Sequence, residues 1–377
     1  MDWTPLFTGT EAESIRNKII EIAHFVSGGP SADPYLMHGD AGRALFLFDC
    51  YRMTEDERYF KSASRLLLSC IKQIQSELLY IDNPQTCRAG FENGLSGIGW
   101  TIDYLLTHEM LENDLVETMG AADSWLLRRM IYDLKSNKLD LMQGAVGIAL
   151  YGLKRKERFV KEYMKRFTED LLAQISQVEL YAVRDFSIPT GLSGLFLLLV
   201  KLQGIYPEFS DLEVITSRIG DIFKLQAEAG QTEESSVMGW CGHIEGTLWA
   251  MSHIPTARDY AIRQWLRLGE RHAVQRKTVW NAGLYGGNFS MGHLFIRLCH
   301  FYRDDRFREF SRMFFRNALQ KADYFEKKTG HTFWLTGINE TYALHRGLLG
   351  GLSGIGLTLM ASIWDREPSW DEALLLS

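Results

Sequence analysis

Two kinds of helical pattern alternate along this chain. In the first kind, apolar residues recur at four-residue steps with charged residues between them, as in Phe159, Tyr163, Phe167 and Leu171. This spacing places the apolar side chains on one face and predicts an amphipathic helix that packs on one side only. We expect outer helices here and near residues 13–26, 56–79, 112–134, 210–226, 257–273 and 307–316.

The second kind of pattern is apolar almost all round the helix. It covers residues 192–202, 294–298 and 355–360, where charged side chains are few. Such a pattern suits a helix that is buried on several sides. We expect these stretches to be inner helices that alternate with the outer ones.

A short glycine-containing segment, here called a glycine knot, opens each expected inner helix. The knots start at residues 39, 94, 144, 191, 243, 287 and 351, so successive starts lie 55, 50, 47, 52, 44 and 64 residues apart. A period of about 50 residues leaves room for two helices and two turns per repeat. Because glycine accepts positive φ and lets backbones come close, we expect the knots to crowd the inner-helix N-termini together.

These repeats predict the architecture. They run from end to end, so residues 1–377 are expected to form a single domain. The last repeat, residues 348–360, is similar to the others and has no polar face to cap an open array. We therefore expect an all-α fold, an α/α toroid of seven inner and seven outer helices. Its converging helix N-termini carry partial positive charge and could receive an anion, a thiolate or a metal.

Composition excludes several classes of function. Hydrophobic residues make up 46% of the chain, charged residues 23%, and the net charge is −6, so we expect a folded core and no nucleic-acid or anionic-membrane partner. No apolar run is long enough for a membrane span and the N-terminus has no targeting pattern, which indicates a cytoplasmic protein. The five cysteines form no Cys-x-x-Cys motif, and most of them are expected to be buried thiols.

Three motifs carry a resemblance to a known family. They are Trp240-Cys241, the Gly283-Leu284-x-x-Gly287 frame, and Leu-Leu-Gly-Gly-Leu-Ser-Gly-Ile-Gly at residues 348–356. Together with the knots, they make the whole chain similar to the lanthionine synthetase C-like proteins, the LanC cyclases of lanthipeptide biosynthesis and their eukaryotic relatives. The resemblance implies a seven-plus-seven α/α barrel, and a zinc ion held by the Trp-Cys cysteine and a Cys-His pair from the next repeat.

The chain departs from this family at the expected zinc ligands. Tyr285 and Gly286 stand where the family has its Cys-His pair. Thr190 stands where the family has a histidine, whereas Asp140 matches the acidic residue before the third knot. Of the implied zinc ligands, only the Trp-Cys cysteine remains.

Zinc binding depends on what replaces the lost pair. A catalytic zinc site needs about three protein donors, so Cys241 alone would not hold the ion and we expect no cofactor. A site rebuilt from Cys241, His243 and His38 is an alternative. The two histidines could equally be hydrogen-bonded core residues.

The resemblance implies peptide cyclisation, in which a substrate cysteine thiol adds to dehydroalanine or dehydrobutyrine and closes a thioether ring. Without zinc, Asp140 or His243 would take the thiol proton and Tyr285 would donate a hydrogen bond to the enolate, next to Cys241. The implied partners are a precursor peptide with a leader and a dehydratase. The residues that we expect to contact the peptide are His38, Asp40, Thr190 and Trp240.

Other interpretations stay open. Asp140 could cap a helix, Tyr285 could fill the volume of a lost metal, and Cys241 could be a packed thiol. The chain would then be an inactive scaffold that binds the leader or the modified peptide. A carbohydrate-active α/α barrel would need paired carboxylates, and acidic residues at the knots are few.

Overall fold

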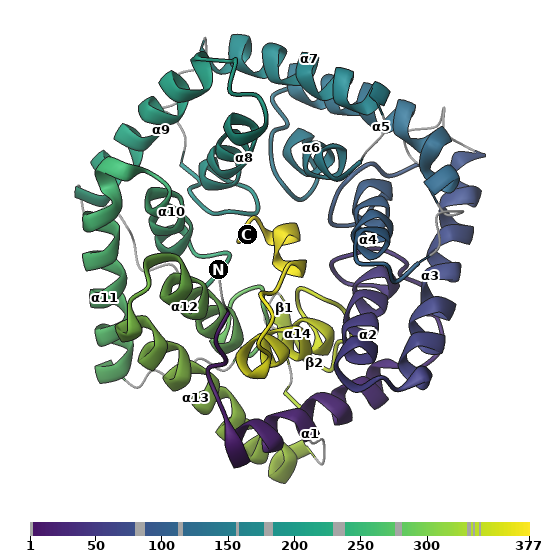
Figure 1. Cartoon of the computed structure of the whole chain (residues 1–377), viewed down its shortest axis with the longest axis vertical. Coiled ribbons are helices and arrows are strands. Elements are labelled where there is room, and N and C mark those ends of the chain that lie inside the picture. The colour runs from purple at the N-terminus through teal and green to yellow at the C-terminus, as the bar shows by residue number, and fades with distance from the viewer. Residues whose placement is uncertain are drawn as a thin grey trace.

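The computed structural model of the protein describes residues 3–79, 87–111, 116–155, 158–176, 184–228, 238–275, 281–329, 333–334, 336–338 and 341–377. Within these residues, fourteen α-helices form two concentric rings around a common axis (Figure 1). The predicted all-α toroid is confirmed.

The outer ring consists of the predicted amphipathic helices. The predicted residues 112–115 lie outside the described part of the chain. The outer helices are α1 (Gly9–Val26), α3 (Glu57–Leu78), α5 (Val116–Lys135), α7 (Arg158–Ile175), α9 (Asp211–Glu228), α11 (Arg258–Gln275) and α13 (Asp305–Thr329).

The inner ring consists of the predicted apolar helices, and each begins at a glycine knot. Their side chains are buried almost without interruption, because they face both the outer ring and the axis. The inner helices are α2 (Asp40–Thr54), α4 (Leu95–Thr107), α6 (Ala145–Lys154), α8 (Leu192–Ile205), α10 (His243–Ser252), α12 (Asn288–Tyr302) and α14 (Leu352–Ile363).

The longest spacing between knots, from the sixth to the seventh, also contains a short hairpin. Strand β1 (Thr336–Ile338) pairs antiparallel with β2 (Thr341–Ala343), with Thr336 opposite Ala343. Two single-turn 3₁₀ helices complete the described elements, η3 (Pro255–Ala257) and η4 (Trp370–Leu374). Neither the hairpin nor these turns was predicted.

Close backbone packing explains the glycines at the knots. The residue before each inner helix has negative φ, for example −107° at Gly144. Positive φ is therefore not the reason for glycine at these caps, whereas the expected close approach is confirmed. A Cβ on Gly97 would lie 2.1 Å from the Phe91 carbonyl oxygen, and one on Gly354 would lie 1.9 Å from that of Leu348. The glycines let the first turn of an inner helix pack against the chain that leads into it.

Backbone hydrogen bonds join neighbouring repeats at the end of the ring where the inner helices begin, here called the mouth. We call this set of bonds the belt. Each runs from an N–H to a carbonyl of the next turn: Met37 to Glu92 (3.3 Å), Glu92 to Met142 (2.9 Å), Leu141 to Pro189 (3.0 Å), Cys241 to Tyr285 (3.2 Å), Tyr285 to Leu349 (3.0 Å) and Leu349 to Met37 (2.7 Å). The last bond joins the seventh repeat to the first. Between the fourth and fifth repeats, Pro189 has no N–H to donate.

The N-terminal segment closes the outer ring. Helix α1 packs against α14 and α2. Three arginines of α13 bind the start of the chain: Arg308 donates to the Pro5 carbonyl (3.1 Å), Arg312 to the Leu6 carbonyl (3.0 Å), and Arg316 to the Glu11 carboxylate (2.8 Å). The first and last repeats are thus joined at both the inner and the outer ring, as a toroid requires.

The C-terminal segment, residues 364–377, fills part of the interior of the ring (Figure 1). Asp371 of η4 is fully buried, and its carboxylate binds His293 Nε2 (2.7 Å) and Arg297 Nε (2.6 Å). Although burial alone raises it, Arg297 and His293 lower the pKa of Asp371 to about 2. Trp249 Nε1 donates to the Leu375 carbonyl (3.1 Å). The segment is therefore anchored to inner helices α10 and α12.

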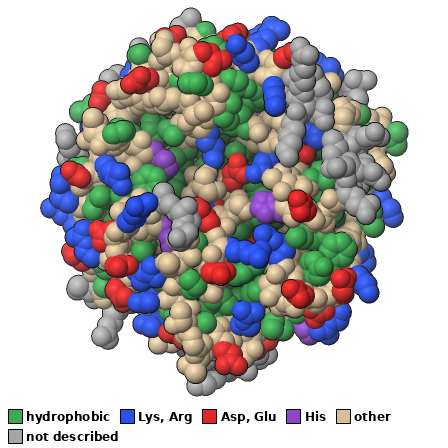
Figure 2. Space-filling model, viewed as in Figure 1, with side chains coloured by type: hydrophobic (Ala, Val, Ile, Leu, Met, Phe, Trp, Pro, Cys, Tyr) green, Lys and Arg blue, Asp and Glu red, His purple; other side chains and the backbone are tan. Residues whose placement is uncertain are grey.

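The structure also shows the state of the cysteines, the character of the helices and the charges on one face. All five cysteines are buried and unpaired, as predicted. No described helix combines the length and the apolar character that a membrane crossing needs. Figure 2 shows Lys and Arg side chains mixed with Asp and Glu over one face of the ring. This face carries interspersed charges of both signs.

Candidate functional site

A pocket with a volume of about 560 Å³ opens at the mouth. Its walls come from the turns that lead into α4, α6, α8, α10 and α12. Helix N-termini from five repeats therefore surround it, and their partial positive charge favours electron-rich groups. The lining residues are Glu92, Asp140, Met142, Gln143, Ser187, Pro189, Thr190, Cys241, His243 and Tyr285.

Cys241 and Tyr285 lie side by side because the belt joins their backbones, and their side chains share a hydrogen bond. Cys241 is 8% exposed, and burial raises the pKa of its thiol well above the ordinary value. Tyr285 is 39% exposed. Two effects raise the pKa of its phenol, first the neighbouring Cys241 and then burial. Both groups therefore keep their protons at neutral pH. Tyr285 can donate a hydrogen bond into the pocket, whereas Cys241 is not a thiolate.

His243 is paired with a carboxylate at the opening of the pocket. Its Nε2 lies 3.4 Å from Asp185 Oδ1. The Asp185 carboxylate accepts hydrogen bonds from the Thr190 hydroxyl (2.6 Å) and the Ser187 N–H (2.8 Å). Burial raises the pKa of Asp185, but these hydrogen bonds outweigh it and the pKa is lowered. Asp185 therefore stays ionised and can orient the His243 ring, which leaves Nδ1 free to accept a proton.

A second histidine is paired with a carboxylate across the pocket. His38 Nε2 lies 3.0 Å from Glu92 Oε1, and Gln143 Nε2 donates to Glu92 Oε2 (2.7 Å). The hydrogen bond from His38 lowers the pKa of Glu92 more than burial raises it. His38 thus lies beside the pocket and acts on it through Glu92.

Asp140 lines the pocket and also stabilises its own turn. Its carboxylate accepts a hydrogen bond from the Gln143 N–H (2.6 Å), and its carbonyl accepts one from the Gly144 N–H (3.1 Å). These bonds cap the turn that leads into α6. The capping interpretation therefore fits Asp140, whose carboxylate is bound to its own turn, whereas the His243 side chain is not.

Asp40 and Trp240, which we expected to contact the peptide, are buried away from the pocket. The Asp40 carboxylate is fully buried and binds Arg43 (2.5 Å). Trp240 is 1% exposed, and its Nε1 donates to the Leu374 carbonyl (2.8 Å). Neither side chain lines the pocket. Both hold the fold together at the mouth, Trp240 by anchoring the C-terminal segment.

Glu245 lies buried behind Cys241 in the first turn of α10. It is 4% exposed, and burial raises its pKa to about 7 against a smaller opposing effect of backbone hydrogen bonds. Its carboxyl group therefore changes charge near neutral pH in a water-excluded position.

The described residues do not fit a zinc site. Among them, no group of three or more His, Cys, Asp or Glu side chains is arranged to hold a metal ion. His38 Nε2 is paired with Glu92 and His243 Nε2 with Asp185, so the two histidines face different carboxylates. Zinc instead binds thiolate and neutral imidazole together in one tetrahedral set. The structure therefore does not support a zinc site rebuilt from Cys241, His243 and His38.

Sequence reasoning missed Glu92, Gln143 and Asp185. Glu92 and Tyr285 hold equivalent places, two residues before the cap glycine of their inner helices. Gln143 is equivalent to Thr190, one residue before the cap. The position of Glu92 and Gln143 relative to their cap glycines could therefore have identified them from the sequence. Asp185 lies six residues before its cap glycine, as Asp33 and Asn281 do, but the sequence does not show that it pairs with His243.

Both the sequence and the fold match known proteins. The sequence model of a family described as "Lanthionine synthetase C-like protein" matches residues 30–375. The chain belongs to this LanC-like family. Among solved structures, one titled "Nisin cyclase" is similar with a TM-score of 0.69 and 14% sequence identity, over 97% of each chain. At that identity the likeness shows the fold alone. No curated protein matches the chain.

This LanC-like protein keeps the toroid of its family and differs at the mouth. Where the resemblance implies a metal-binding pair, Tyr285 and Gly286 take part in a turn whose backbone bonds are those of the belt. The polar groups at the mouth include a phenol, two histidine–carboxylate pairs and helix N-termini.

Proposed function

We propose that this protein cyclises a ribosomally made peptide without zinc, by adding cysteine thiols to dehydroalanine or dehydrobutyrine to form lanthionine or methyllanthionine rings. The observation that carries this proposal is the protonated, partly exposed Tyr285 phenol in a pocket that also contains the His243–Asp185 pair. A hydrogen-bond donor and an oriented base in one pocket are what this addition needs.

The proposed reaction has two proton steps. His243 Nδ1 takes the proton from the substrate thiol, and the sulfur attacks the β-carbon of the dehydro residue. The electron pair of the carbon–carbon double bond moves to the carbonyl oxygen, which accepts a hydrogen bond from Tyr285. The protonated His243 then returns a proton to the α-carbon, so that the enzyme ends in its starting state. Holding thiol and alkene in contact supplies the proximity.

The substrate and partners follow from the same proposal. The substrate is a leader-bearing precursor peptide that a dehydratase has already modified, and the reaction takes place in the cytoplasm. His38, acting through Glu92, and Thr190, which holds Asp185, would shape the pocket around the peptide. Cys241 would hold Tyr285 in place as a neutral thiol.

One observation favours a second candidate, a scaffold that binds the peptide without chemistry. Cys241 is buried and protonated, so the family cysteine no longer offers a thiolate. A carbohydrate-active enzyme gains no similar support, because the lining carboxylates Glu92 and Asp140 are held by His38 and Gln143.

The test uses a synthetic peptide that contains a dehydroalanine and a cysteine, with free thiols counted over time. We expect the protein to accelerate thiol loss, and a chelator to leave the rate unchanged. Tyr285→Phe and His243→Gln should each lower kcat about 100-fold, because each removes one group that acts in the transition state. Lys161→Ala, an exposed lysine of α7, is the control. Thiol loss at the uncatalysed rate with tight peptide binding would favour the scaffold.

A further inference from the structure

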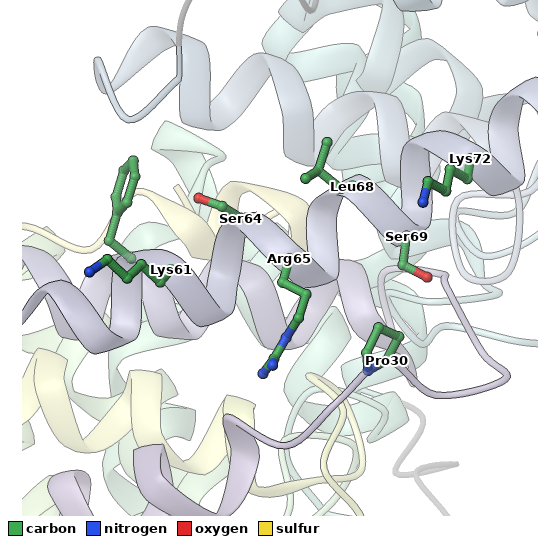
Figure 3. A pocket seen from close by; sticks show the side chains of 8 residues that line it. Pro30, Lys61, Ser64, Arg65, Leu68, Ser69 and Lys72 are labelled. Carbon is green, nitrogen blue, oxygen red and sulfur yellow. The ribbon is translucent and has the colours of Figure 1, made fainter.

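A second pocket lies on the outer wall of the ring and shares no described lining residue with the pocket at the mouth. It is a groove with a volume of about 460 Å³ along α3. Lys61, Arg65, Leu68 and Lys72 extend from successive turns of this helix, and Pro30 contributes from the loop that follows α1 (Figure 3). Nothing in the proposed reaction uses these residues.

The groove carries positive charge. Among the described residues, its lining includes three cations and no carboxylate. Within the described part of the chain, Lys61 and Lys72 make no hydrogen bond or ion pair, and Arg65 donates to the Ser27 carbonyl (3.0 Å). The protein as a whole has a net charge of −6. This helix face therefore differs in sign from the whole molecule and attracts anionic groups locally.

Acidic residues at the ends of α3 do not neutralise the groove. Asp56 binds Arg58 (2.5 Å), and Glu57, the first residue of α3, does not line the groove. Glu77 is buried and accepts a hydrogen bond from the Tyr35 hydroxyl (2.6 Å). Because Tyr35 precedes α2 at the mouth, this bond also shows that α3 ends near the mouth. The Lys72 end of the groove therefore lies nearer to the mouth than the Lys61 end.

The size of the groove suits a peptide better than a folded protein. Eight of the described residues line it, whereas a stable protein–protein interface uses about 20–30 residues a side. Leu68 is 55% exposed and offers an apolar contact among the three cations. An occupant with carboxylates and an apolar side chain would complement it.

We propose that this groove binds an acidic segment of the peptide substrate, with carboxylates on Lys61, Arg65 and Lys72 and an apolar side chain on Leu68. The identity of the ligand rests on the proposed function, since a peptide is the proposed substrate. One chain can then lie along α3 and reach into the mouth, which raises the effective concentration of its reacting residues there.

The first test measures binding alone. The probe is a short fluorescein-labelled peptide that is rich in glutamate and contains a leucine, compared with the same peptide with glutamine in place of glutamate. We expect the glutamate peptide to bind more tightly, with an affinity that falls as salt is raised. The double variant Lys61→Ala/Lys72→Ala and the variant Leu68→Asp should each weaken binding about tenfold.

Matched controls lie on other outer helices. Lys161→Ala on α7 and Leu225→Asp on α9, where Leu225 is 54% exposed, should leave binding unchanged. Equal binding of the two peptides, or unchanged binding by Lys61→Ala/Lys72→Ala, would overturn the proposal. Failure of the wild-type protein to bind the glutamate peptide would also overturn it, and a folded acidic partner would become the better occupant.

The second test separates this inference from the proposed function. The dehydroalanine-containing peptide is prepared with and without an acidic N-terminal extension. We expect the extension to lower KM for wild-type protein and not for Lys61→Ala/Lys72→Ala, with kcat similar in both. Tyr285→Phe should still bind the acidic probe as wild-type protein does. If no protein cyclises the peptide but the groove variants still weaken binding, the proposed function fails and the docking surface stands.

Discussion

At the scale of single residues, the mouth is organised by which groups keep their protons. Burial keeps the Cys241 thiol protonated, and Tyr285 beside it stays a phenol. Asp185 and Glu92 are ionised because hydrogen bonds stabilise their charge. The mouth thus offers hydrogen-bond donors and paired histidines but, among the described residues, no thiolate. In the proposed reaction, the sulfur nucleophile therefore comes from the substrate.

Glu245 gives a pH-dependent prediction. Its pKa is raised from 4.5 to about 7 by burial, so folding favours its neutral form. The stability that this group contributes is complete below about pH 4.5 and is lost as the pH rises through about 7. Glu245→Gln should match wild type at pH 4 and be more stable at pH 8 by about 3 kcal/mol. Urea denaturation at the two pH values measures the difference.

The control for this prediction is Glu213→Gln, an exposed carboxylate of α9. It should change stability little at either pH. If Glu245→Gln and Glu213→Gln behave alike at pH 8, the Glu245 carboxyl is not held in the neutral form.

At the scale of elements, the glycine knots set how closely an inner helix approaches the turn before it. The cap residues have ordinary extended backbone, so flexibility is not what the sequence selects here. The space beside Gly97 and Gly354 is occupied by carbonyl oxygens of the preceding turn. Each helix pair therefore requires glycine where its inner helix packs against the turn before it.

Gly97→Ala tests this requirement. The added Cβ would lie 2.1 Å from the Phe91 carbonyl oxygen, so the turn or the helix must shift. We expect a loss of about 1–3 kcal/mol in the free energy of unfolding, measured by urea denaturation. Gly120→Ala is the control, because nothing lies within 4 Å of a Cβ at this exposed position in α5. It should gain about 0.5–1 kcal/mol. Equal effects of the two substitutions would contradict the steric explanation.

The sequence predicted the helices far better than the side chains at the mouth. The two helical patterns and the knot period depend on local spacing, and the structure contains the helices that they indicate. Contacts such as His243 with Asp185 join different repeats and depend on how turns meet in space. Asp40 and Trp240 look like site residues by position, but Arg43 and the C-terminal segment bind them inside the fold. The linear sequence pattern cannot distinguish a residue that lines the pocket from one that is bound inside the fold.

At the scale of the whole molecule, both ends of the chain stabilise the closed ring. The N-terminal segment binds α13 and α14, while η4 lies inside the ring and binds α12. The centre of the toroid therefore contains buried ion pairs in place of a purely apolar core. Buried charges of this kind are stable only while each keeps its partner.

Asp371→Asn tests the anchoring of the C-terminal segment. It leaves the buried Arg297 guanidinium without its main carboxylate, so we expect a loss of about 3–5 kcal/mol in the free energy of unfolding. Because the pKa of Asp371 is lowered to about 2, its contribution is complete above about pH 4 and is lost as the pH falls toward 2. Asp365→Asn, at an exposed position of the same segment, should have little effect. A similar loss for both variants would argue against this anchoring.

The belt separates the architecture of the toroid from its chemistry. Its bonds use only main-chain groups, so they form whatever side chain each turn presents. Substituting Tyr285 or Glu92 therefore alters the reactivity of the mouth without breaking the link between repeats. These positions can therefore be substituted one at a time, by evolution or by design. Proteins with the same toroid can then carry entirely different side chains at the mouth.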